Sequence, residues 1–126
     1  MTNETKKVFD LEERTARFGE NIIVFVKKIP KHEITKPLIS QLIRSGTSVG
    51  ANYCEADCAE SRKDFEHKLG ICKKEAKETK YWLRIISKAE PMLIKEAKIL
   101  WKESNELQLI FISIIKKSKI NRKEGI

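Results

Sequence analysis

Apolar side chains recur along residues 61–88 with the spacing of one face of an α-helix. Successive members of the set are three or four residues apart, and the segment contains no proline and a single glycine. This spacing places them along one continuous apolar seam. Ser61 is suited to cap the helix, and Asp64 falls in its first turn. We therefore predict a helix over residues 62–88, whose seam consists of Phe65, Leu69, Cys72, Ala76, Thr79, Leu83 and Ile86.

A second row of positions on the same segment is entirely cationic. At about 100° per residue, this row lies about 110° around the helix axis from the apolar seam and extends for about 22 Å. The predicted helix therefore buries one side and presents positive charge on another. We call this row the basic stripe, and it consists of Lys73, Lys77, Lys80, Arg84 and Lys88.

Three further segments show helical periodicity, at residues 11–28, 36–57 and 92–119. Asp10 and Thr35 are placed to cap the first two, and Pro30 and Pro91 separate the helices. We expect residues 1–9 to be frayed and the polar tail 120–126 to be disordered. Four helices with short connections predict an all-α, antiparallel up-down-up-down four-helix bundle.

The middle of the second predicted helix consists almost entirely of small residues. Gly46 and Gly50 are poor helix formers, and each costs roughly 0.5–1 kcal/mol in a helix interior. Either another helix approaches closely at these glycines and offsets the cost, or the segment is a flexible loop.

The third helix has one more face than a monomer needs, on the side away from the basic stripe. Its apolar members could close a subunit interface, with the two carboxylates pairing across it, or the face could simply widen the core. The face consists of Ile71, Glu75, Glu78, Trp82 and Ile85.

The charge of the chain is unevenly distributed. The first 60 of the 126 residues hold nine basic and nine acidic side chains, whereas the remainder hold seventeen and nine, and the net charge is +8. Such asymmetry favours an anionic partner, nucleic acid first, although lysines also keep helical proteins soluble. No apolar run reaches the roughly 18 residues of a membrane span, and no signal peptide is recognisable, so we expect a cytoplasmic protein without membrane contact.

Residues 40–86 carry a resemblance to a known family. The run 40–56 is similar to the second helix of the four-helix-bundle family named after proteins encoded in 23S ribosomal RNA intervening sequences. The family usually has glycine where Ala56 stands here. A second set of residues is similar to the family's third helix. This set consists of Ser61, Lys63, Asp64, Phe65, Glu75, Glu78, Tyr81, Trp82 and Leu83.

The resemblance implies a small antiparallel bundle that assembles as a ring-like homopentamer. A related fold is the accessory variability determinant of diversity-generating retroelements, a basic pentameric barrel that works with a reverse transcriptase and its template RNA. A reverse transcriptase is therefore one protein partner that the resemblance suggests. For most of the family, it implies no defined molecular activity.

The sequence gives little support to catalysis or to a metal or other cofactor. His32 and His67 have no nucleophile at a telling spacing, and the chain lacks both a phosphate-binding glycine loop and Glu-x-x-His pairs. The three cysteines, together with His67, lack zinc-site spacing, so we expect buried, reduced thiols at Cys54, Cys58 and Cys72. We interpret Asn52 and Glu55 as a polar network with Arg44 or with a neighbouring subunit.

Two functions remain open, and neither is enzymatic. In the first, the basic stripe binds RNA or DNA through the phosphate backbone, with Tyr81 close enough to stack on a base. In the second, the protein is a structural or adaptor oligomer whose lysines only confer solubility.

Overall fold

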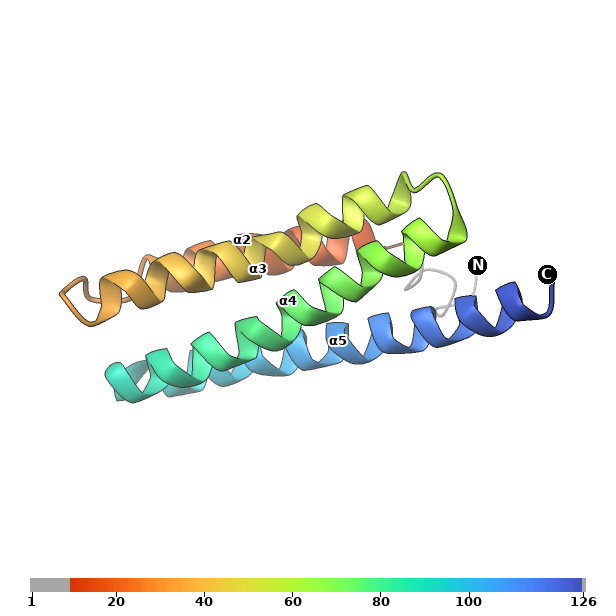
Figure 1. The fold of residues 1–126 in the computed structure, drawn as a ribbon. Coiled ribbons are helices and arrows are strands. Elements are labelled where there is room, and N and C mark those ends of the chain that lie inside the picture. Colours follow the sequence, from red (N-terminus) through yellow and green to blue (C-terminus); the bar gives the residue numbers. More distant parts are fainter. Residues whose placement is uncertain (1–9, 126) are drawn as a thin grey trace.

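The computed structural model describes residues 10–125, which form four α-helices and one short 3-10 turn without strands. The predicted frayed segment 1–9 lies outside the described residues. The elements are α2 (Leu11–Val26), α3 (Thr35–Asp57), α4 (Arg62–Ala89), the 3-10 turn η1 (Pro91–Leu93) and α5 (Ile94–Lys123). Each helix packs against the next one in the chain, and α2 also touches α5 (Figure 1).

The bundle core follows the seam predicted for residues 62–88 closely. In α4, all seam positions from Leu69 to Ile86 are buried, and Phe65 at its start is half-buried. Their partners on the other helices include Phe18 and Ile22 of α2, Leu42 of α3 and Phe111 of α5, each at most 1% exposed. Buried hydroxyl groups in this core are hydrogen-bonded, since Thr79 Oγ1 donates to the Glu75 carbonyl oxygen and Ser104 Oγ donates to the Ala76 carbonyl oxygen, each at 2.7 Å.

The small-residue segment of α3 is helical, and α2 approaches it closely. A methyl group built on Gly46 would stand 2.8 Å from Ile22 Cγ1, and one on Gly50 would stand 3.2 Å from the Thr15 carbonyl oxygen. This contact confirms the close approach predicted from the glycines and rules out the alternative of a flexible loop. The absence of a side chain at Gly46 makes room for the Ile22 side chain, and its absence at Gly50 lets the α3 backbone approach the α2 backbone at Thr15.

One predicted helix cap is confirmed and two are wrong. Ser61 Oγ accepts a hydrogen bond from the Asp64 backbone N–H at 3.1 Å. Asp10 makes no side-chain capping bond. Thr35 is the first residue of α3 rather than its cap, and its hydroxyl instead donates to the Pro30 carbonyl oxygen at 2.6 Å and stabilises the preceding turn.

The predicted disordered tail is helical for most of its length. α5 continues to Lys123, four residues beyond the expected end at 119. The reason is an interaction with the start of α4. Arg122 and Ser118 hydrogen-bond the carboxylate of Glu66, which is only 7% exposed. The last turns are therefore tied to the bundle.

Candidate nucleic-acid interface

The basic stripe occupies the flank of α4 that borders α5. Its cations project away from the core, because the seam positions Ala76 and Leu83, about 110° away around the helix axis, hold another side of α4 in the core. Lys77, Arg84 and Lys88 are exposed, whereas Lys73 and Lys80 are half-buried. The structure thus places all five side chains along one helix, as predicted.

No stripe cation forms an ion pair with a carboxylate of residues 10–125. Other cations of the bundle behave differently. Arg14 pairs with Glu103 at 2.8 Å, Arg122 pairs with Glu66 at 3.0 Å, and Lys28 pairs with Glu96 at 3.1 Å. The basic stripe is therefore a surface of positive charge that the described part of the chain does not neutralise.

Lys80 is the member of the stripe whose side chain contacts α5. Its ammonium donates to Asn105 Oδ1 at 2.8 Å and lies 5.0 Å from the ring centre of Trp101. Partial burial, with a smaller contribution from the charge of Lys77, lowers the pKa of Lys80 below its ordinary value. The first effect reflects the contact of Lys80 with α5, and only the second reflects neighbouring positive charge.

Tyr81 stands at the far edge of the stripe and is 54% exposed. Its ring meets Trp82 edge to face, with the ring centres 5.0 Å apart. On the near edge, Trp101 of α5 is 41% exposed. Trp101 and Asn105 also belong to this surface and were not predicted from the sequence. They lie 21 and 25 residues after Lys80, and only the packing of α5 against α4 brings them together.

The extra face of α4 is used largely within the chain. Arg44 of α3 pairs with Glu75 at 2.9 Å and also with Glu78, and its hydrogen bond lowers the pKa of Glu78. Trp82 packs against the core and donates its indole N–H to Glu78 at 3.3 Å. Ile71 and Ile85 are half-buried. Both carboxylates thus have partners in their own chain, and the subunit interface stays a prediction.

The predicted polar network within one chain is wrong. Arg44 bonds to α4 as described, whereas Asn52 donates to the Ser48 carbonyl oxygen at 2.8 Å and Glu55 accepts from Lys68 at 3.3 Å. The three residues share no hydrogen bond, because two helical turns separate Arg44 from Asn52 on α3.

The cysteines follow the prediction only in part. All three are free thiols, but only Cys72 is buried, whereas Cys54 and Cys58 are exposed. Burial raises the pKa of the Cys72 thiol to about 12. Within residues 10–125, no group of three or more His, Cys, Asp or Glu side chains is placed to hold a metal ion.

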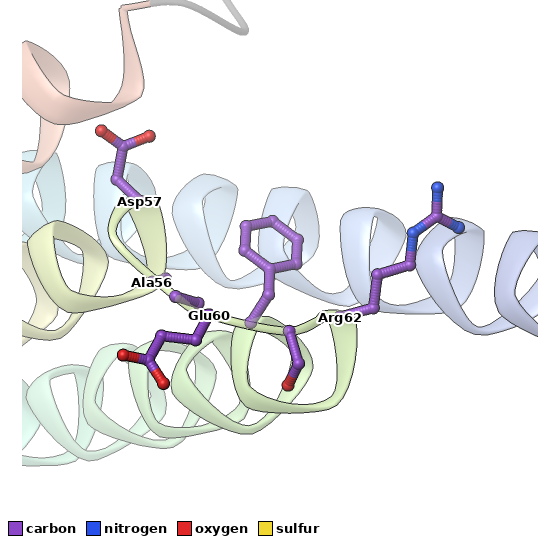
Figure 2. Close-up of a pocket in the computed structure, with 7 residues that line it drawn as sticks. Ala56, Asp57, Glu60 and Arg62 are labelled. Atoms are coloured by element: carbon purple, nitrogen blue, oxygen red, sulfur yellow. The ribbon is translucent and has the colours of Figure 1, made fainter.

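The surface of the described residues has two pockets whose lining side chains form no recognisable catalytic or ligand-binding group. One lies at the turn between α3 and α4 beside Phe65, where Figure 2 shows the side chains of Asp57, Glu60 and Arg62 pointing in different directions. The other lies between α2 and α3 and is lined mainly by small side chains around Gly19 and Gly50.

Among the described helices, none is long and apolar enough to cross a membrane.

Comparison with known proteins identifies a family and a solved structure that are similar to this chain. Residues 7–113 match the 23S rRNA-intervening sequence protein family. A crystal structure from Bacteroides thetaiotaomicron, described as a protein with unknown function from the S23 ribosomal protein family, is 36% identical, with a TM-score of 0.76. The match covers 83% of this chain and 97% of that one. No curated protein is significantly similar. The chain therefore belongs to the 23S rRNA-intervening sequence protein family, which confirms the resemblance found in residues 40–86.

Proposed function

We propose that this protein binds nucleic acid, RNA in the first place, through the basic stripe and without catalysing a reaction. The observation that supports the proposal is the set of five aligned cations that have no acidic partner among residues 10–125. A cation already held in an ion pair must give up its partner before it binds a phosphate. The stripe cations have no such cost.

The composition of the stripe favours contacts to phosphates over the reading of bases. Four of its members are lysines, which act as compact point charges, and only Arg84 offers a planar fork for bidentate hydrogen bonds. Contacts to the backbone position a protein on nucleic acid but carry no sequence information. We therefore expect binding that depends strongly on salt and little on sequence.

The family supports RNA as the first polyanion to test, since its name refers to ribosomal RNA. Within this proposal, the protein acts in the cytoplasm. As the resemblance suggests, it works alone or beside a protein partner such as a reverse transcriptase.

We further propose that the chain is an antiparallel bundle that assembles as a ring-like homopentamer. The connections between helices lie at alternate ends of the molecule in Figure 1, which supports the antiparallel order. Ile71, Trp82 and Ile85 are the candidate contacts between subunits. A ring would repeat the basic stripe in every subunit and so strengthen binding to a long polyanion. Light scattering would measure the subunit number, and a monomer would contradict the ring.

A structural or adaptor oligomer without nucleic acid is the second candidate. The observation that favours it is the exposed apolar surface of α5, where Ile99 is 69%, Leu109 58% and Ile112 42% exposed. Such surface can mark a site of protein contact. In that case the lysines would only keep the assembly in solution.

A salt titration separates the two candidates. Binding of a labelled single-stranded RNA is followed by fluorescence anisotropy between about 50 and 200 mM salt. If five cations of one subunit contact phosphates, the logarithm of the binding constant should fall with the logarithm of salt with a slope of about −3.5. Failure to bind even at the lowest salt would contradict nucleic-acid binding and favour the adaptor.

A further inference from the structure

Trp101 is an exposed aromatic residue that the bundle does not need for its core. The core positions of α5 around it are Ala97, Leu100 and Ser104, all of which are buried. Trp101 lies outside this line and keeps 41% of its surface accessible. An indole combines a large apolar face with a polar N–H, so an accessible tryptophan is suited to contact with a ligand.

The position of Trp101 relative to the cations is well defined. The Lys80 ammonium lies 5.0 Å from the ring centre, which is within the range of a cation–π contact. The same ammonium is held by Asn105, one helical turn further along α5. The indole is therefore fixed against the basic stripe.

A second exposed aromatic residue borders the stripe on its other side. Around the axis of α4, Arg84 lies about 40°, Lys77 about 60° and Tyr81 about 100° from Lys80. The cations are therefore flanked by Trp101 on the α5 side and by Tyr81 on the opposite side. Single-stranded nucleic acid is typically bound by this combination, because cations hold the backbone while aromatic rings stack on bases.

We propose that the stripe selects single-stranded nucleic acid, and that an unpaired base stacks on Trp101 while Lys77 and Lys80 hold the adjacent phosphates. This inference rests on the proposed function and refines its substrate class. A duplex keeps its base faces within its own stack and offers only phosphates to the stripe. The selection follows from this difference, since only an unpaired strand gains the contact with the indole.

The test compares a labelled 12-nucleotide oligouridine with an RNA duplex of 12 base pairs, at the same low salt. Wild-type protein should bind the single strand more tightly. Trp101→Leu should weaken binding of the single strand by about fivefold or more, because stacking contributes roughly 1–3 kcal/mol per base. Its affinity for the duplex should stay within about twofold of wild type, since the phosphate contacts remain.

Two controls separate stacking from a structural effect. Trp101→Phe keeps an aromatic face and should restore most of the affinity for the single strand. Ile99→Ala removes a still more exposed apolar side chain, about 160° away around α5, and should change neither affinity. Circular dichroism confirms that each variant is helical. Oligouridine should also quench the tryptophan fluorescence of the wild type and leave that of Trp101→Leu unchanged.

Two kinds of result would contradict the role proposed for Trp101. Equal losses on single strand and duplex, or no loss on either, would overturn the role of Trp101 and leave electrostatic binding standing. Failure of the wild type to bind either RNA would overturn both this inference and the proposed function.

Discussion

The Glu66 carboxylate near the start of α4 accepts two hydrogen bonds from the guanidinium of Arg122, which is one residue before the end of α5. The distances are 3.2 Å from Nε and 3.0 Å from Nη2, and Ser118 donates a third bond at 2.9 Å. Three donors around one carboxylate fasten the C-terminal turns of α5 to α4. These turns lie beyond residue 113, where the match to the family ends.

This contact predicts a pH-dependent difference in stability between wild type and Glu66→Gln. The hydrogen bonds from Arg122 lower the pKa of Glu66 below its ordinary value of 4.5. The unfolded chain therefore takes up the proton first, and stability from this group is lost as pH falls through the lower, folded-state pKa. Wild type should be the more stable protein at pH 7, and the difference should shrink progressively below about pH 4.5.

Thermal unfolding at a series of pH values measures the difference. Glu60→Gln is the matched control, because its exposed carboxylate makes no hydrogen bond within residues 10–125. A stability difference for Glu66→Gln that is the same at pH 3 and pH 7 would show that the carboxylate is not held by Arg122 as described.

Two glycine-to-alanine substitutions should change stability in opposite directions. At Gly46, the new methyl group would meet Ile22 Cγ1 at 2.8 Å, and Ile22 is fully buried, so we expect a loss of about 1–3 kcal/mol. At Gly70, the methyl group would meet nothing within 4 Å, so the better helix propensity of alanine should add about 0.5–1 kcal/mol. Urea denaturation measures both. A stabilised Gly46→Ala would contradict the close packing of α2 on α3.

The three thiols should differ in reactivity. Cys72 is fully buried, its pKa is raised to about 12, and its Sγ lies 3.5 Å from the Val49 carbonyl oxygen. Thiolate is the reactive form, so Cys72 should react with a thiol reagent at pH 8 only when the bundle opens. A colorimetric titration of native protein should therefore count two thiols quickly, from Cys54 and Cys58, and the third only in denaturant. Three rapid reactions would contradict the burial of Cys72.

The helices and the core were predictable because their signal is local. Each seam repeats every three or four residues, so positions such as Leu69 and Leu83 could be assigned to the core from their neighbours alone. The exposure of Cys54 could also have been foreseen. It directly follows Tyr53, an aromatic residue that packs against the core, and one residue turns the helix by about 100°.

The features that could not be predicted from the sequence depend on contacts between residues that are distant in the chain. Nothing in the polar run 120–123 indicates a helix, because its support comes from Glu66, which is 56 residues before Arg122. The place of Trp101 beside the basic stripe could not be predicted for the same reason, since only the packing of α4 on α5 brings its ring next to Lys80. Arg44 could be assigned a carboxylate partner in advance, but the choice among Glu55, Glu75 and Glu78 required the register of α3 on α4.

The position of positive charge, rather than its amount, is the basis of the proposed function. Lys77→Glu, Lys80→Glu and Arg84→Glu together reverse the middle of the basic stripe. Lys27→Glu, Lys31→Glu and Lys36→Glu reverse three exposed cations that belong to the turn between α2 and α3 or border it. Both triple variants replace three positive charges by three negative ones, so they lower the net charge of +8 equally.

The decisive measurement for the proposed function is fluorescence anisotropy of a labelled single-stranded RNA at about 50 mM salt, with wild type and both triple variants. The stripe variant should bind more than about tenfold more weakly than wild type, and the slope of its salt dependence should be smaller by about 2, as expected for three lost phosphate contacts. The control variant should bind within about threefold of wild type, because screening weakens the effect of distant charges. Equal losses in the two variants would contradict a defined binding surface on α4.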